Sequence, residues 1–345
     1  MTGATADRLI RLMDLPLLIT GGYDHTLRYW NAHLGQCFRT IPYNDSHINC
    51  LEVTPDKTQV LCAGNPLMKL FDLASASNTA VSTMDGHTSN VTSVGFEKTG
   101  RWFFSSSEDS SVKIWDCRGT GYQLSLDNES TSTATMATTA GAPVPVHGAA
   151  LHANQAEVLL GDQEGRVQVW DLSANRIRQV LAPDKAVAIK TVALSADGRL
   201  AAAANHKGTL FVWRYLPDTL DPMQKIDAHS AYVLRIRFCP QSQYLITTSA
   251  DSNACLWRYH VDGFAKETSL IGHIRWVWGG IFSSDSAYVV TCSSDTTAKL
   301  WEVKTGQTAI DYTGHTKAVT VVALVDVPDG GSGPDAPPVQ QHNIS

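Results

Sequence analysis

Short runs of alternating apolar and polar residues occupy most of the chain, and each run is bounded by Gly, Ser or Asp. In residues 272–302 the runs WVWGGIF and AYVVTCSS are separated by SSDS, and a third run, TTAKLW, follows Asp295. Alternation over such short runs predicts β-strands joined by tight turns. No stretch keeps a helical period over three turns, so we predict no helix outside the first dozen residues, where the pattern is weak.

One unit of this pattern recurs seven times. Each unit ends on an aromatic residue, and these residues are Trp30, Phe71, Trp115, Trp170, Trp213, Trp257 and Trp301. The spacings between them are 41, 44, 55, 43, 44 and 44 residues. A repeat of about 44 residues is typical of WD-repeat β-propellers, in which each unit supplies a four-stranded blade. We therefore predict an all-β fold, a seven-bladed propeller over residues 15–326.

The two ends of the repeat array predict how the ring closes. The first unit starts directly with the second strand, LPLLITGG, and the last unit is followed by an unpaired first strand in GHTKAVTVVALVD. We expect residues 318–326 to form the inner strand of the blade that residues 15–41 complete, which removes the exposed sheet edges.

Three segments fall outside the repeat pattern. Residues 1–14 are a lead-in, and residues 327–345 are rich in Gly and Pro, so we expect a disordered tail there. The long spacing between Trp115 and Trp170 contains a Ser/Thr-rich stretch at 127–143 with almost no large apolar side chain. We expect this stretch to be a flexible insert between the third and fourth blades.

Four units contain a hydroxyl, an imidazole, a carboxylate and an indole at matching positions. These tetrads are Thr20, Asp24, Trp30 and His315; His87, Ser105, Asp109 and Trp115; His229, Thr247, Asp251 and Trp257; and His273, Thr291, Asp295 and Trp301. Such groups resemble a nucleophilic triad, but four copies with identical spacing favour a hydrogen-bonded structural network. The other three units lack the His and the Asp, and we expect their blades to depend more on apolar packing.

No other chemical signature supports an enzyme. Phosphate-binding-loop, nucleophile-elbow, zinc-protease and EF-hand motifs are missing from the sequence. His147 and His152 lie five residues apart, which on a strand places them on opposite faces, so we do not predict a metal site there. The seven cysteines are scattered without a C-x-x-C pair, as in an intracellular protein. We predict no catalytic residue, no cofactor and no small-molecule substrate.

Composition narrows the class of partner. The 345 residues include 33 acidic and 27 basic side chains, which gives a net charge of −6. This balance argues against a nucleic-acid partner. No apolar run is long enough to span a bilayer, and the N-terminus lacks the apolar core of a signal peptide. We expect a cytoplasmic protein that does not insert into membranes.

A propeller without a catalytic signature is usually a platform for protein partners. The residue just before the first strand is small or polar in most units, but it is Tyr232 and Trp276 in two consecutive ones. Trp278 and Arg275 lie beside Trp276, and Trp102 is a further large aromatic. Aromatic residues and Arg dominate binding hot spots, so these five residues are candidate partner contacts. The alternative that each Trp packs between blades remains open.

Several stretches resemble one family, the small WD-repeat subunit of the target-of-rapamycin (TOR) kinase complexes. They are GGYDHTLRYWNAHLGQCFRT at 21–40, INCLEVTPD at 48–56, SVGFEKTGRW at 93–102, LHANQAEVLLGDQEGRVQVWDL at 151–172 and RWVWGGIFSSDSAYVV at 275–290. The resemblance implies a non-catalytic scaffold subunit of TOR complexes 1 and 2, in nutrient and growth signalling. It implies that the chain binds and stabilises the TOR kinase catalytic domain beside its active site, and meets the other subunits indirectly.

Two other readings of the repeat stay open. One is a different WD-repeat adaptor, such as a ubiquitin-ligase substrate receptor or a G-protein β-type subunit, although no coiled-coil heptads precede the propeller. The other is an enzyme that uses the central channel of the propeller, against which the missing motifs argue. Within a TOR complex, we expect the cytoplasmic protein to reach endomembranes through the kinase complex.

Overall fold

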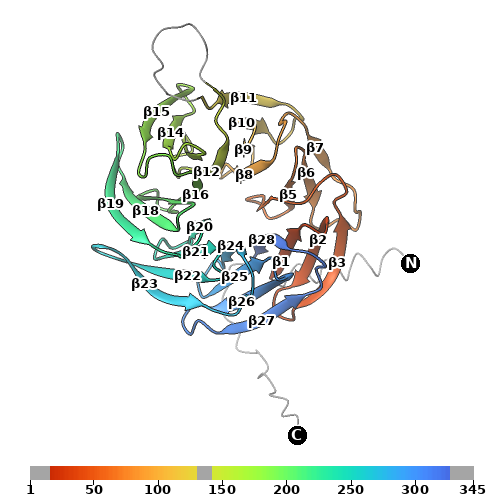
Figure 1. Cartoon of the computed structure of the whole chain (residues 1–345). Coiled ribbons are helices and arrows are strands. Elements are labelled where there is room, and N and C mark those ends of the chain that lie inside the picture. The colour runs from red at the N-terminus through yellow and green to blue at the C-terminus, as the bar shows by residue number, and fades with distance from the viewer. Residues whose placement is uncertain (1–15, 130–141, 327–345) are drawn as a thin grey trace.

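The computed structural model describes residues 16–129 and 142–326, which form a closed ring of seven four-stranded antiparallel sheets (Figure 1). No helix occurs within these ranges. The all-β, seven-bladed propeller that the repeat predicts is therefore confirmed. The predicted lead-in at 1–14 and tail at 327–345 lie outside the described residues.

The strands of each blade run outwards from the central channel in chain order, with one exception in the first blade. The first blade consists of β28 (Val319–Val325), β1 (Leu17–Gly22), β2 (Thr26–Asn31) and β3 (Gln36–Pro42). The second consists of β4 (Cys50–Val53), β5 (Gln59–Ala63), β6 (Met68–Asp72) and β7 (Ser82–Met84). The third consists of β8 (Val91–Phe96), β9 (Trp102–Ser107), β10 (Ser111–Asp116) and β11 (Tyr122–Asp127).

The remaining four blades follow the same order. The fourth consists of β12 (Val146–Leu151), β13 (Glu157–Asp162), β14 (Val167–Asp171) and β15 (Arg176–Leu181). The fifth consists of β16 (Ile189–Leu194), β17 (Leu200–Asn205), β18 (Thr209–Tyr215) and β19 (Leu220–Asp227). The sixth consists of β20 (Val233–Phe238), β21 (Tyr244–Ser249), β22 (Ala254–His260) and β23 (Gly263–Leu270). The seventh consists of β24 (Val277–Phe282), β25 (Tyr288–Ser293), β26 (Thr297–Glu302) and β27 (Thr308–Thr313).

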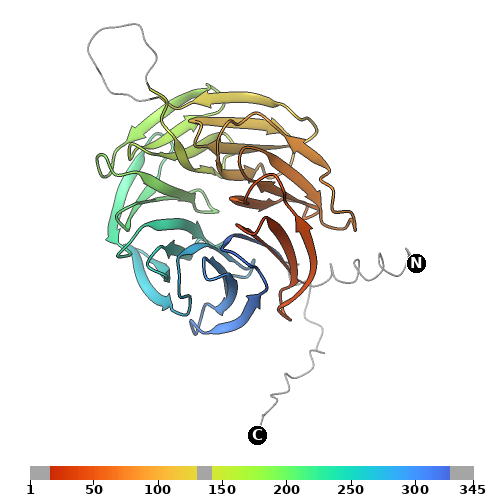
Figure 2. The same ribbon diagram turned by 45° about the vertical axis from the view of Figure 1, so that its right-hand side comes forward.

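The core lies between the blades rather than within any one of them. The second strand of each blade is buried on both faces; all six residues of β1 and of β17 are buried, for example. The outer strands are mostly exposed; β3 and β27 each have one buried residue, Ile41 and Tyr312. Figure 2 shows the blades from an oblique angle, each stacked against the next around the ring. Such stacking needs runs with apolar residues on both faces, which explains the low charged fraction of 17%.

The ring closes through an antiparallel pair made by the two ends of the described chain. β28 pairs with β1 in a register that sets Leu324 opposite Leu18 and Val322 opposite Thr20. The Thr320 hydroxyl donates to the Ile48 carbonyl oxygen at 2.5 Å, which joins the closing strand to the second blade. The predicted closure by residues 318–326 is confirmed.

Two expectations about the fourth blade differ from the structure. The predicted insert at 127–143 begins too early, because Asp127 ends β11 and Asn128 is buried. Asn128 donates to the carbonyl oxygen of Val144 at 2.9 Å, so the two ends of the insert belong to the folded ring. Residues 130–141 lie outside the described ranges.

The fourth blade also does not rely on apolar packing alone. Arg166 Nε lies 2.6 Å from Asp162 Oδ2, and both side chains are buried. Gln168 donates to Asp162 and to Asn128, each at 2.8 Å, so the buried charges have hydrogen-bond partners. The expectation that this blade depends more on apolar packing overlooks this network, which occupies the place of the missing His and Asp.

The closing strand provides a direct test of the fold. A chain that ends after residue 317 lacks β28 and therefore loses the buried side chains of Val319, Val321 and Val322. Burial of each Val stabilises a fold by roughly 1.5–3 kcal/mol, so the loss approaches the total stability of an ordinary domain. We expect this chain to lose its cooperative thermal transition, followed by circular dichroism. A chain that ends after residue 326 keeps β28 and is the control; equal melting of both chains would contradict the closure.

Candidate partner-binding face

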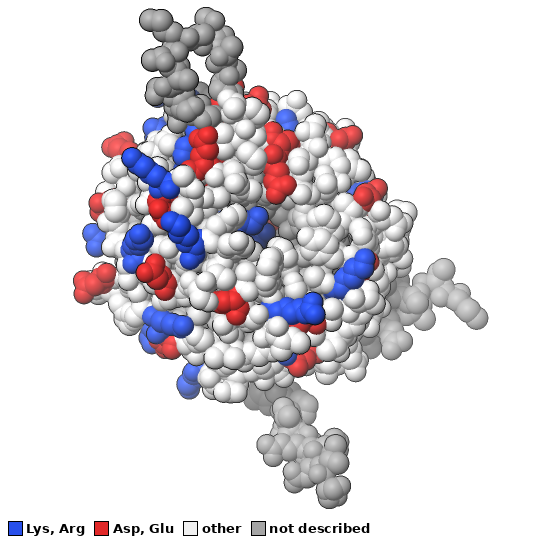
Figure 3. Space-filling view, in the orientation of Figure 1, with Lys and Arg blue, Asp and Glu red and all other residues white. Residues whose placement is uncertain are grey.

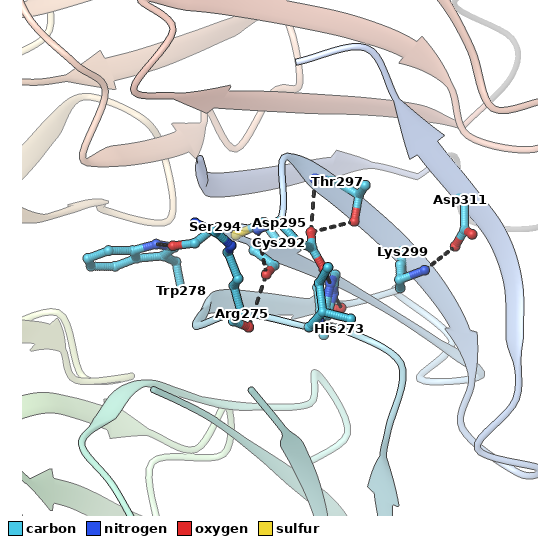
Figure 4. Close-up of polar contacts among 12 residues, drawn as sticks. His273, Arg275, Trp278, Cys292, Ser294, Asp295, Thr297, Lys299 and Asp311 are labelled. Atoms are coloured by element: carbon cyan, nitrogen blue, oxygen red, sulfur yellow. Dashed lines mark hydrogen bonds and ion pairs between the residues drawn. The ribbon is translucent and has the colours of Figure 1, made fainter. Parts of the chain in front are cut away.

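Each tetrad is a chain of hydrogen bonds that crosses one blade. In the seventh blade, Trp301 Nε1 donates to Thr291 Oγ1 at 2.8 Å, and this hydroxyl lies 2.8 Å from His273 Nε2. His273 Nδ1 lies 2.7 Å from Asp295 Oδ2 (Figure 4). Because the carboxylate can only accept, His273 Nδ1 carries the proton and Nε2 accepts the hydroxyl proton of Thr291. The indole N–H, the hydroxyl and both imidazole nitrogens of this tetrad thereby all have hydrogen-bond partners.

The same chain of bonds occurs in the first, third and sixth blades. The successive distances from Trp to hydroxyl, hydroxyl to His and His to Asp are 2.8, 2.7 and 2.8 Å for Trp30, Thr20, His315 and Asp24. They are 2.7, 2.6 and 2.8 Å for Trp115, Ser105, His87 and Asp109. They are 2.9, 2.7 and 2.9 Å for Trp257, Thr247, His229 and Asp251.

These groups cannot act as nucleophilic triads. The hydroxyls of Thr20, Ser105, Thr247 and Thr291 belong to residues with no exposed surface. Each hydroxyl is already engaged on both sides, by the indole that donates to it and by the imidazole next to it. A nucleophile needs room for a substrate atom beside it. The tetrads therefore connect the loop before the first strand with the second and third strands of the same blade.

The Asp of each tetrad also holds the turn between the second and third strands. Asp295 Oδ1 accepts from the backbone N–H and the hydroxyl of Thr297, at 3.0 and 2.7 Å (Figure 4). Burial opposes ionisation of this carboxyl, but the hydrogen bonds from His273 and Thr297 outweigh it and hold its pKa well below the ordinary value. Asp24 and Asp109 have a lowered pKa for the same reason.

Four of the five predicted partner contacts lie on one face of the disc, at the mouth of the central channel. Tyr232 and Trp276 are 49% and 43% exposed, and each directly precedes the inner strand of its blade. Arg275 is exposed beside Trp276. Trp278 is half-buried, and its ring centroid lies 5.7 Å from that of Trp276.

The Trp278 indole is fixed in place by its surroundings. Its Nε1 donates to Ser294 Oγ at 2.7 Å, and Figure 4 shows the ring projecting away from the tetrad of the same blade. The centroid of the Tyr23 ring lies 6.3 Å from that of the Trp278 ring. A rigid indole of this kind loses little conformational entropy on binding, which favours it as a contact residue.

The structure adds three rings to this face that the sequence analysis did not single out. Tyr23 is exposed and stacks on His47 at 4.6 Å, and His206 lies 5.1 Å from Tyr232. Tyr23 and His206 follow the second strand of their blades, whereas the repeat pattern that points to Tyr232 and Trp276 concerns only positions before the first strand. We call Tyr23, His47, His206, Tyr232, Trp276 and Trp278 the aromatic mouth.

Trp102 does not belong to the aromatic mouth. It begins β9 and pairs with Asp116, at the opposite end of the blade from Val91, which begins the inner strand. Its half-buried ring packs against the cluster of apolar residues between the third and fourth blades. Trp102 therefore lies apart from the other four candidate contacts, and a partner contact at Trp102 would involve the opposite face of the disc.

The two histidines considered as metal ligands have other partners. His147 Nε2 is hydrogen-bonded to Gln163, and His152 Nε2 lies 2.9 Å from the carbonyl oxygen of Gly198. The His152 ring also stacks on Tyr215 at 4.1 Å. Over residues 16–129 and 142–326, no group of three or more His, Cys, Asp or Glu side chains is placed to hold a metal ion. None of the same residues forms a helix long and apolar enough to cross a bilayer.

Comparison with known proteins adds to this geometry. The profile of the family described as WD domain, G-beta repeat matches residues 78–116, 220–258 and 265–302. The chain is 43% identical over 314 residues to Target of rapamycin complex subunit wat1 of Schizosaccharomyces pombe, covering 90% of this chain and 96% of that protein. It is 41% identical over 318 residues to Protein LST8 homolog of Drosophila melanogaster, with the same two coverages. It is 37% identical over 244 residues to Target of rapamycin complex subunit LST8 of Bos taurus, covering 69% and 71%.

The lowered Asp pKa values predict acid sensitivity. The pKa of Asp24, Asp109 and Asp295 lies below the ordinary 3.8 in the folded chain, so the unfolded chain binds these protons first. The contribution of these three carboxyl groups to the free energy of unfolding is therefore fully present above about pH 5. It decreases as the pH drops below about 4. Urea unfolding at a series of pH values measures this loss.

Asp109→Asn isolates one tetrad. We expect it to reduce stability at neutral pH by about 1.5–3 kcal/mol, the net worth of hydrogen bonds to a charged group, and to lessen the loss in acid. Asp218→Asn makes the same change of charge at an exposed residue and serves as the control. An Asp109→Asn chain as acid-sensitive as the parent would show that the tetrads do not govern this response.

Proposed function

This chain belongs to the LST8 family, which includes proteins named target of rapamycin complex subunit, and we propose that it serves as a non-catalytic subunit of TOR complexes 1 and 2. The likeness extends over 90% of the chain. It supports membership of a TOR complex. The finer statement, that the chain binds and stabilises the TOR kinase domain near its active site, is our proposal.

The aromatic mouth is the observation that supports the proposed contact. Tyr232 and Trp276 lie on consecutive blades, and each exposes close to half of its surface. Exposed aromatic side chains on a rigid frame, with an Arg beside them, are the residues that contribute most to protein interfaces. A kinase-domain segment with apolar side chains would bury both rings on one face of the disc.

The same geometry supports a scaffold role. The hydroxyls of the tetrads are sealed inside the blades, and the closed ring holds the mouth residues on strand ends. A rigid surface of this kind stabilises a mobile partner because the subunit pays little entropy on binding. We place the subunit in nutrient and growth signalling. We also propose that it is cytoplasmic, and that the kinase complex recruits it to endomembranes.

Substitution at the mouth tests the contact. We expect Tyr232→Ala combined with Trp276→Ala to weaken binding to the purified TOR kinase domain at least tenfold, about 1.4 kcal/mol, because two hot-spot rings are lost. Surface plasmon resonance measures the affinity. Both side chains are exposed, so the thermal unfolding of the chain should change little.

Tyr288→Ala is the matched control. Tyr288 is 40% exposed but starts β25, at the opposite end of the blade from Trp276. Its loss should leave kinase binding unchanged. Equal affinity of the mouth variant and the parent chain would place the interface elsewhere. Recovery of ubiquitin-ligase subunits without a TOR kinase, in a pull-down with the full chain, would instead support the alternative adaptor role.

A further inference from the structure

The inner strands build a cavity just below the aromatic mouth. The second residue of six inner strands points into it, together with the residue before β4; these are Thr92, His147, Lys190, Leu234, Trp278, Thr320 and Asn49. The cavity has a volume of about 210 Å³. Figure 3 shows the hollow at the centre of the disc, with basic side-chain atoms inside it. We call it the channel cavity.

Two cations in the channel cavity have no acidic partner. Lys190 and Arg235 both line it, and neither forms an ion pair within the described residues. Arg237 lies two residues further along the same strand as Arg235 and differs in this respect, because its Nη2 lies 3.2 Å from Glu52 of the second blade, across the channel. Glu108 is the single carboxylate among the described lining residues, and it accepts from Asn90 at 2.8 Å.

The cations of the cavity also repel one another. Burial lowers the pKa of Lys190; the charge of Glu108 opposes this effect, and the weaker effect of the Arg235 charge adds to the lowering. The pKa of His206, at the mouth, is lowered by burial and then by the charge of Lys190. Holding like charges in a confined, partly desolvated space costs free energy that an anion between them would return.

Two hydroxyls add further donors to the lining of the same cavity. Ser93 Oγ accepts from the backbone N–H of Ala149 at 3.2 Å, and Thr191 Oγ1 accepts from that of Ile236 at 3.3 Å. Each hydroxyl therefore keeps its own O–H to donate, and both residues line the cavity with Arg235. Neutral hydroxyls next to a guanidinium and an ammonium make a donor set suited to a phosphate group.

We propose that the channel cavity binds a phosphate-type oxyanion, held by Lys190 and Arg235 with Ser93 and Thr191 as additional donors. Its volume fits a small anion such as inorganic phosphate or pyrophosphate with several waters. The lining of the cavity contains Lys190, Arg235 and one carboxylate, so it is net positive, whereas the whole protein has a net charge of −6. An anion is therefore favoured at this cavity over the rest of the surface. This inference goes beyond the proposed kinase contact and does not depend on it.

The test uses the isolated full-length chain in a chloride buffer. Isothermal titration with pyrophosphate and with inorganic phosphate should show binding to one site, with an affinity that falls as NaCl is raised. Lys190→Gln and Arg235→Gln remove one charge each and should weaken binding at least tenfold. Arg199→Gln removes the same charge from an 86% exposed side chain elsewhere and should leave binding unchanged.

Stability without anion separates a binding defect from a folding defect. Because burial disfavours the charge of Lys190, and neither Lys190 nor Arg235 forms an ion pair within the described residues, each Gln variant should melt at the same temperature as the parent chain or higher when no anion is present. Pyrophosphate should raise the melting temperature of the parent chain and of Arg199→Gln only. Two results would overturn the free-anion site. The first is a parent chain for which neither anion gives a binding signal in the titration or a change in melting temperature. The second is an Arg235→Gln chain that binds the anions as tightly as the parent chain.

A second arm identifies the source of the phosphate group. A short phosphoserine peptide that competes with pyrophosphate, and depends on Lys190 and Arg235, would assign the site to a phosphorylated partner segment entering the mouth. Binding of the free anions alone would assign it to a soluble phosphate. Failure of both arms overturns the proposal, and neither outcome bears on the affinity for the kinase domain.

Discussion

Each blade of this propeller buries two faces, and it can do so only against its neighbours. The fully buried second strands, such as the Ala-rich β17, have no solvent face at all, so a sheet at an open end would expose a complete apolar surface. The pairing of β28 with β1 meets this constraint because it locks the first and last repeats into one sheet. Closure in turn fixes the positions of all seven inner strands, and with them the mouth and the channel cavity.

The loop ahead of each inner strand must also be fixed to its own blade, and the chain does this in two ways. In four blades an imidazole from that loop reaches the hydroxyl of the second strand and the carboxylate of the next turn. In the fourth blade Asn128, from the corresponding loop, bonds to Asp162, Arg166 and Gln168 instead. Both arrangements satisfy every buried polar partner that they bring together, which is the condition for such networks to stabilise a fold.

The sequence predicted what depends on local pattern and could not predict what depends on distant partners. The seven repeats and the closing strand follow from strand alternation and from the spacing of the Trp residues, both visible within one unit. The network of the fourth blade joins Asn128 to residues 34–40 positions away, with no repeated spacing to reveal it. The sequence could not show that Trp102 lies apart from the other candidate contacts, because residue type alone does not say at which end of a blade a side chain lies. Arg235 and Lys190 come from different repeats, and their shared cavity exists only once the ring is closed.

The closing pair also determines when this protein can finish folding. Thr20 is synthesised early, but its partner Val322 lies about 300 residues later in the chain. Six blades are made of consecutive segments and can form in order as the polypeptide leaves the ribosome, whereas the first blade has to wait for the last strand. Until then β1 keeps an unpaired edge and an uncovered apolar face, which are the features that favour aggregation. The architecture that makes the finished ring rigid therefore makes its last step a long-range one, and such steps are slow.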